Sequence, residues 1–98
     1  MSYQVKVSIF AKKDRLNITK YLSQYSVNAP RKFKNELKRY LNLIGEKPGI
    51  FAVFAANHAY RHVVVFGSYT LFYTVNEAEK IVMVYRILHG AQDIESIL

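Results

Sequence analysis

The sequence contains no cysteine among its 98 residues. Disulfide bonds, cysteine nucleophiles and thiolate metal sites are therefore excluded, and this composition fits a cytosolic protein best. It also lacks a run of about 18 apolar residues, and its first residues lack the apolar core of a signal peptide. We therefore expect a cytoplasmic protein that is neither exported nor inserted into a membrane.

Acidic residues are scarce in the first half of the chain. Eleven Lys and Arg residues but only three Asp and Glu residues precede Pro48, a charge of +8, whereas the remainder carries −1. This asymmetry indicates an anionic partner, either nucleic acid or an acidic protein segment. The alternative is a solvated helix face that only aids solubility. The residues that we expect to bind a partner are Arg15, Arg31, Lys34, Lys38 and Arg61.

The length and the apolar share of 51% predict a single domain, residues 1–98, with one modest core. Alternating apolar and polar residues predict a first strand over 3–9. Apolar residues at helical spacing then predict two helices, over about 13–25 and 29–44. We expect Gly45 to end the second helix.

Residues 48–59 contain no Lys, Arg, Asp or Glu and have no clear period, so we expect a packed loop there. β-Branched and aromatic residues predict three further strands, over 61–66, 69–75 and 80–88, which form a meander. The last is apolar on both faces, which places it inside the sheet. The predicted fold class is α+β with the order β-α-α-β-β-β: a helical hairpin on one face of a mainly antiparallel four-stranded sheet, with a short C-terminal tail.

Two segments of the second half carry a family motif. Residues 85–98, YRILHGAQDIESIL, resemble the closing segment of ParE-like toxins, which typically end in Arg-x-Leu-His-Gly-x-Arg-Asp and a short apolar tail. Residues 69–75, YTLFYTV, are similar to the Tyr-x-Ile-x-Tyr-x-Val strand of that family, and Arg61 falls where the family usually has Arg. The element order also matches, so the chain is identified as a member of the RelE/ParE superfamily, in its ParE-like branch.

The resemblance implies the toxin of a type II toxin-antitoxin system, of the kind linked to plasmid stabilisation and growth arrest. Its implied partners are a cognate antitoxin with an acidic segment, which neutralises it, and DNA gyrase, which it would inhibit by binding. Operator DNA would be reached only through the antitoxin, and no membrane partner is expected. The alternatives are a ribosome-dependent mRNA endonuclease of RelE type and an inactive member that binds only antitoxin and operator DNA. Gln92 stands where many relatives have Arg, which weakens the RNase alternative.

RelE-type cleavage uses basic residues, His or Tyr to move protons and to stabilise phosphate charge, without a metal. The weak catalytic candidates here are Arg61, Arg86, His89 and Tyr85, and Tyr73 is a further candidate of lower rank. In an extended strand Arg86 and His89 project to opposite faces, which argues against an acid-base pair, so the catalytic residues stay unknown.

Structural roles remain open for two of these candidates. Arg86 could equally pair with a carboxylate such as Asp93, and His89 could bind the backbone where the strand ends. His58 and His62 have no acidic residue at ligand spacing, so we expect neither a metal nor a cofactor.

Overall fold

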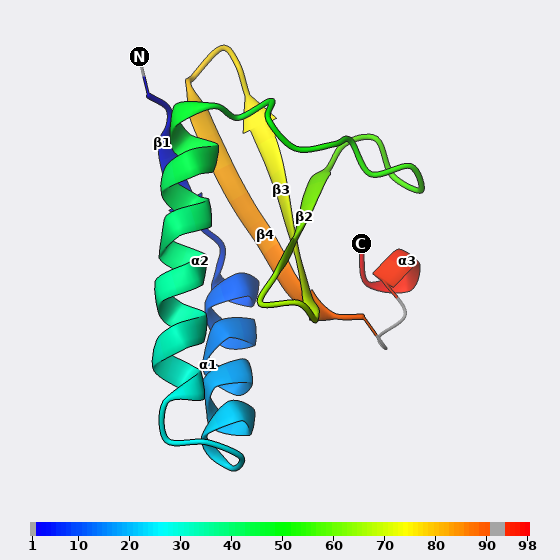
Figure 1. Ribbon diagram of the computed structural model, residues 1–98. Coiled ribbons are helices and arrows are strands. Elements are labelled where there is room, and N and C mark those ends of the chain that lie inside the picture. Colours follow the sequence, from blue (N-terminus) through cyan, green and yellow to red (C-terminus); the bar gives the residue numbers. More distant parts are fainter. Residues whose placement is uncertain (1, 91–93) are drawn as a thin grey trace.

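The computed structural model describes residues 2–90 and 94–98. Its elements are β1 (Gln4–Val7), α1 (Ile9–Ser23), α2 (Ala29–Glu46), β2 (Arg61–Val65), β3 (Tyr69–Asn76), β4 (Ile81–His89) and α3 (Ile94–Ile97). Figure 1 shows α1 and α2 as a long hairpin on one side of the sheet, with α3 beyond the end of β4. The predicted α+β class and element order are confirmed.

The four strands form one mixed sheet in the order β1-β4-β3-β2. β1 runs parallel to β4, whereas β4 with β3 and β3 with β2 are antiparallel. β4 therefore lies inside the sheet, as its two apolar faces predicted. The register between β3 and β4 shifts between Phe72 and Tyr73. Gln92 and Asp93 lie outside the described residues.

The first helix begins earlier than the sequence pattern predicted. Ser8 is its N-cap: the Ser8 Oγ accepts a hydrogen bond from the Ala11 N–H at 3.0 Å and donates one to the Tyr85 carbonyl at 2.6 Å. Because this cap ends the strand after Val7, Ile9 belongs to α1 and is 76% exposed. The prediction of a strand over 3–9 was therefore too long, because alternation alone does not reveal a capping serine.

Gly45 lies within α2 and does not end it, which corrects the prediction. A Cβ atom at Gly45 would lie 2.9 Å from the Val5 Cγ2, and the Gly45 carbonyl accepts a hydrogen bond from the Tyr3 N–H at 2.7 Å. Glycine is needed here because α2 and the start of β1 approach closely.

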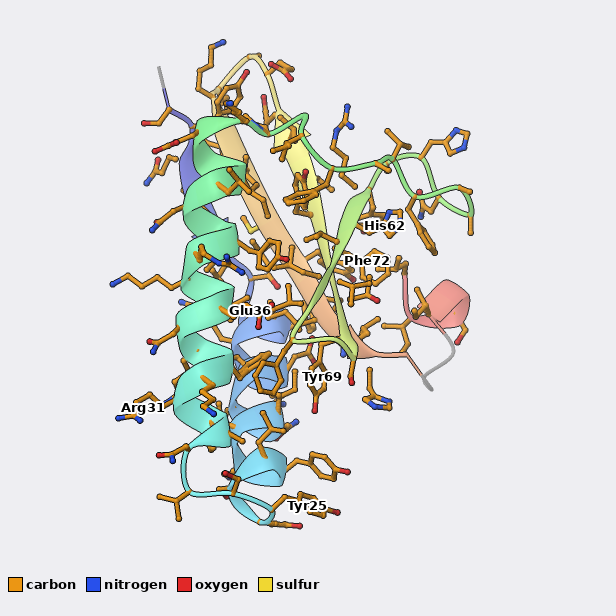
Figure 2. All side chains as sticks on the ribbon, in the orientation of Figure 1. Tyr25, Arg31, Glu36, His62, Tyr69 and Phe72 are labelled. Atoms are coloured by element: carbon orange, nitrogen blue, oxygen red, sulfur yellow. The ribbon has the colours of Figure 1, made fainter. Side chains whose placement is uncertain are left out.

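The core lies between the helical hairpin and the sheet. Phe33 of α2 packs edge to face against Tyr69 of β3, with ring centroids 5.5 Å apart. Glu36 fixes the turn between β2 and β3, because its Oε1 accepts a hydrogen bond from the Phe66 N–H at 3.1 Å; Figure 2 shows Glu36 reaching from α2 toward this turn. The fully buried large side chains are Tyr73, Phe33, Phe72, Ile44, Leu71, Leu88, Val65, Val82 and Val84.

The segment between α2 and β2 is a loop, as predicted, but only part of it is packed, because Ile50 and Val53 are 47% and 42% exposed. The Tyr73 hydroxyl donates to the Pro48 carbonyl at 2.7 Å, and the Arg61 guanidinium donates to the Phe51 carbonyl at 2.7 Å. The His62 N–H donates to the Ala52 carbonyl, so the loop also covers part of the β2 edge. Within the described part of the chain, no helix combines the length and apolarity that crossing a membrane requires.

Candidate functional site

Three of the predicted partner-binding residues surround one hollow between α1 and α2, which we call the basic groove. Arg15 comes from α1, while Lys34 and Lys38 come from α2, one turn apart. Leu37, which is 2% exposed, and Leu41 complete the lining of this hollow of about 390 Å³. Helical spacing explains the arrangement, because residues four apart on α2 lie on the same side of the helix.

The groove cations have no acidic partner within the described residues, where the single ion pair found joins Arg86 to Asp14. Their charge is therefore available to a partner that supplies carboxylates or phosphates. Apolar lining combined with unpaired cations fits an amphipathic acidic protein segment better than it fits bare phosphate.

The other two predicted partner-binding residues lie outside the groove. Arg31 is one turn before Lys34; its Nη2 lies 3.4 Å from the Asn28 Oδ1, and Figure 2 shows its side chain directed away from the sheet. Arg61 lies at the start of β2 and holds the Phe51 carbonyl. Three of the five predicted residues therefore lie together around the groove, and two do not. That any of the five binds a partner stays a prediction.

Arg86 is held in a carboxylate clamp. Its Nε and Nη2 donate to the Asp14 carboxylate at 2.7 and 2.9 Å, and the Ile87 N–H donates to the same carboxylate at 3.0 Å. The hydrogen bond that Arg86 donates to Asp14 raises the pKa of Arg86 above its ordinary value. The structural alternative for Arg86 is thus the one observed, with Asp14 of α1 as the carboxylate.

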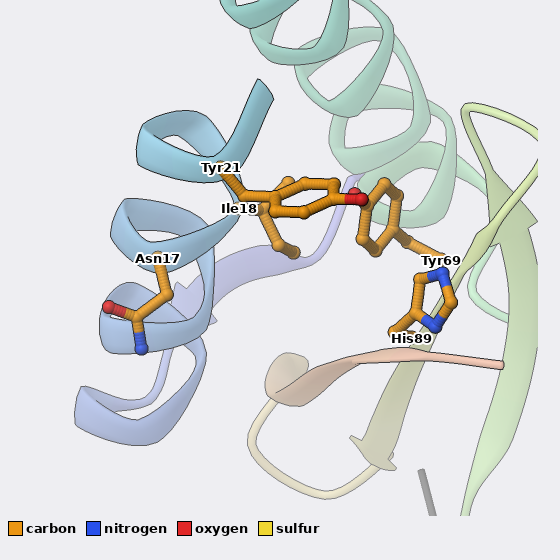
Figure 3. Close-up of a pocket in the computed structure, with 5 residues that line it drawn as sticks. All are labelled: Asn17, Ile18, Tyr21, Tyr69 and His89. Atoms are coloured by element: carbon orange, nitrogen blue, oxygen red, sulfur yellow. The ribbon is translucent and has the colours of Figure 1, made fainter. Parts of the chain in front are cut away.

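His89 lies at the end of β4 beside a hollow of about 320 Å³. Its ring contacts Tyr69 edge to face at 5.5 Å, and Figure 3 shows Tyr21 reaching from α1 toward Tyr69. A hydrogen bond with Tyr25 raises the pKa of Tyr21, and burial raises the pKa of Tyr69. Both phenols therefore stay protonated near neutral pH and are poor general bases.

Tyr85 belongs to a third, separate group of side chains. Its ring stacks on Tyr60 at 5.5 Å and meets Phe10 edge to face at 5.8 Å. Burial, followed by the influence of Tyr85, raises the pKa of Tyr60. Tyr73 is fully buried under the loop, and burial raises its pKa as well.

Arg61 lies opposite Tyr73 in the β2–β3 pairing, whereas Arg86 and His89 lie elsewhere. Arg86 donates hydrogen bonds to Asp14, and Arg61 donates one to the Phe51 carbonyl of the loop. The His89 ring contacts the Tyr69 ring. Among residues 2–90 and 94–98, no three His, Asp or Glu side chains are grouped so that they could hold a metal ion. Within the described part of the chain, Arg86, Arg61 and His89 thus each have a different set of neighbours.

Sequence reasoning missed Asp14 as the residue that fixes the sheet edge. Beyond the end of β1, the Tyr85 carbonyl accepts from Ser8 and the Ile87 N–H donates to Asp14, so α1 replaces the missing strand. The available signal was weak: Asp14 is one of only three acidic residues in the basic half of the chain.

Several solved structures share this fold. The Pseudomonas aeruginosa chromosomal ParDE system matches with a TM-score of 0.74 and 13% identity, over 90% of this chain and 96% of that one. The Mycobacterium tuberculosis RelBE2 complex matches with a TM-score of 0.69 and 15% identity, over 91% and 99%. A mutant of Escherichia coli toxin RelE in the free state matches with a TM-score of 0.69 and 18% identity, over 99% and 93%. These likenesses show a shared fold.

A comparison of the amino-acid sequence with family models identifies the family. Residues 5–94 match the family model described as the ParE toxin of the type II toxin-antitoxin system parDE. The chain therefore belongs to the ParE toxin family. No curated protein sequence matches it.

Proposed function

We propose that this ParE-family toxin inhibits DNA gyrase by binding it, and that a cognate antitoxin with an acidic segment neutralises the toxin. The observation that carries the first part is the separation of the catalytic candidates. Arg86 is committed to Asp14 with two hydrogen bonds, so releasing it for phosphate chemistry would expose a partly buried carboxylate. Binding requires no such release.

The basic groove supports the second part of the proposal. Arg15, Lys34 and Lys38 surround an apolar lining, so a segment with acidic and apolar residues can satisfy both. Exposed charges of this kind increase the association rate more than they increase affinity. They are screened beyond about 10 Å at roughly 0.1 M salt.

The antitoxin part is tested by the association kinetics of the chain with the protein encoded by the reading frame next to its gene. We expect the association rate to fall steeply with added salt, and to fall in a Lys34→Gln/Lys38→Gln variant. Lys6→Gln is the control, because Lys6 is also exposed but lies on β1. An association rate that ignores salt, or that falls equally in the control, would contradict binding through the groove.

The gyrase part is tested by comparing two reactions with the same protein preparation. Purified toxin should inhibit supercoiling by gyrase. The variants His89→Ala and Arg61→Ala should still inhibit it, because inhibition by binding needs no catalytic residue. Site-specific cuts in mRNA on translating ribosomes, lost in those two variants, would instead establish the RelE-type endonuclease. An effect on neither reaction, with the antitoxin still bound, would indicate a member that only binds antitoxin and operator DNA.

A further inference from the structure

The second helix has a polar side that takes no part in the core or in the basic groove. We call it the outer face of α2, and it consists of five exposed residues: Arg31, Lys32, Asn35, Arg39 and Asn42. They lie on the side of the helix opposite Phe33, Leu37 and Ile44, which are buried. Figure 1 shows α2 at the left margin of the molecule, where this face meets solvent.

Helical spacing orders the outer face into two parallel rows. Asn35 and Asn42 are seven residues, or about two turns, apart and lie along one line of the helix. Lys32 and Arg39 are also seven apart, and each lies three residues before one of the asparagines, so the two lines are neighbours. A row of cations therefore runs beside a row of amides, over a length of about 16 Å at a rise of about 1.5 Å per residue.

The acidic residues of α2 do not neutralise this face. Glu36 is turned toward the sheet, where its carboxylate accepts a hydrogen bond from the Phe66 N–H at 3.1 Å. Glu46 is the last residue of the helix. Among the residues that the structure describes, the ion pair found lies elsewhere, between α1 and β4, so the cations of the outer face have no carboxylate partner there. The face therefore has a positive potential along its length.

Two guanidinium groups of the face are held in position without losing their charge. The Arg39 Cζ lies 5.4 Å from the centroid of the Tyr40 ring, and the Arg31 Nη2 lies 3.4 Å from the Asn28 Oδ1. A guanidinium has five N–H donors, so most of them stay available to a ligand. A side chain that is already held loses less conformational entropy when it binds.

We propose that the outer face of α2 binds duplex DNA directly, through contacts to the backbone phosphates that do not depend on base sequence. Arg, Lys and Asn are side chains that commonly donate to phosphate oxygens. The proposal goes beyond the proposed function, because it requires neither gyrase nor an antitoxin. It also differs from the expectation that operator DNA is reached only through the antitoxin.

The composition of the face favours duplex DNA over three other ligands. An acidic protein segment would find no apolar anchor here, whereas the basic groove offers Leu37 and Leu41. A single-stranded nucleic acid is bound mainly by stacking on aromatic side chains, which the five residues lack. The major groove of B-DNA is about 12 Å wide and admits an α-helix, whereas that of duplex RNA is deep and narrow.

The test measures binding of a short fluorescent DNA duplex of arbitrary sequence by anisotropy, between roughly 0.05 and 0.2 M salt. We expect Lys32→Gln/Arg39→Gln to bind at least about tenfold more weakly at roughly 0.1 M salt, because two phosphate contacts are lost. The slope of log affinity against log salt should fall in magnitude by about 1.8. Asn35→Asp/Asn42→Asp should also weaken binding, because it places two carboxylates against the phosphates.

The matched control is Lys12→Gln/Lys13→Gln, which makes the same change of net charge at exposed positions of α1. It should change the affinity far less than either α2 variant. Glutamine is a good helix former, so circular dichroism and the melting temperature should be the same in the control and in Lys32→Gln/Arg39→Gln. Equal losses in the control and the α2 variants would show that net charge alone attracts DNA, and the proposal would be wrong.

Two further outcomes would overturn the proposal. One is the absence of binding by the unaltered toxin at roughly 0.05 M salt. The other is tighter binding of a duplex RNA or of polyglutamate through the same residues, which would identify a different ligand. Neither outcome affects the proposed function, because supercoiling by gyrase and antitoxin binding through the basic groove are measured separately.

Discussion

Removal of the Asp14 carboxylate is expected to destabilise the protein strongly, although Asp14 is a single residue on a basic helix. Its carboxylate accepts hydrogen bonds from two nitrogens of Arg86 and from the Ile87 N–H, at 2.7, 2.9 and 3.0 Å. The Asp14 and Arg86 side chains are only 13% and 21% exposed, so solvent replaces the lost contacts poorly. Asp14→Ala leaves both the guanidinium and an edge N–H without their partner.

The magnitude follows from these contacts. Breaking a fully buried ion pair costs about 3–5 kcal/mol, and a hydrogen bond to a charged group contributes about 1.5–3 kcal/mol. Because the pair is partly exposed, we expect Asp14→Ala to lower the free energy of unfolding by about 2–4 kcal/mol. Asp14→Asn keeps an acceptor for the Ile87 N–H, so its cost should be smaller.

Urea denaturation of Asp14→Ala, Arg86→Met and the double variant measures the coupling between the two side chains. We expect the double variant to lose less than the sum of the single losses, by about 1–3 kcal/mol, because removing both partners leaves no unpaired charge. Additive losses, or a loss below about 0.5 kcal/mol in Asp14→Ala, would refute the clamp as a structural element.

Two further substitutions test packing and ionisation. Gly45→Ala should cost about 1–3 kcal/mol in urea denaturation, because the new methyl group would press on Val5, whereas Gly49→Ala, where a Cβ meets nothing within 4 Å, should cost far less. Burial raises the pKa of Tyr73, so the stability it contributes is fully present below its unfolded pKa of about 10 and is lost as the pH rises through the higher folded pKa. Tyr73→Phe should therefore lower the free energy of unfolding by about 1 kcal/mol at pH 7, because the hydrogen bond of the hydroxyl is lost. Its free energy of unfolding should also fall less steeply above about pH 10 than that of the unaltered protein, and an unchanged alkaline unfolding transition would contradict this.

Much of the fold could be predicted from local patterns. Alternation and helical spacing gave the element types and their order, and the two apolar faces of β4 gave its interior position. The errors fell where a local signal was overridden by a contact distant in sequence. Glycine is the residue type that often ends a helix, but Gly45 lies within α2, where Val5 packs against it. Ile9 continues the strand alternation, but Ser8 caps a helix there.

The candidate site was harder to predict for the same reason. Lys34 and Lys38 are neighbours by helical spacing, so sequence could place them together, whereas the position of Arg15 beside them depends on how α1 packs on α2. Asp14 and Arg86 are 72 residues apart, and nothing in a single sequence pairs them. Helical spacing also does not reveal that Leu16 is 54% exposed.

We propose that the toxin acts by binding gyrase and not by catalysis. The most direct measurement is a titration of toxin against a fixed amount of gyrase, with DNA supercoiling as the readout. We expect inhibition to follow the toxin-to-gyrase ratio, to be complete only once toxin exceeds gyrase, and to be reversed by the antitoxin. Unaffected supercoiling at a large excess of folded toxin, with mRNA on ribosomes cut by toxin present in smaller amounts than the ribosomes, would contradict the claim.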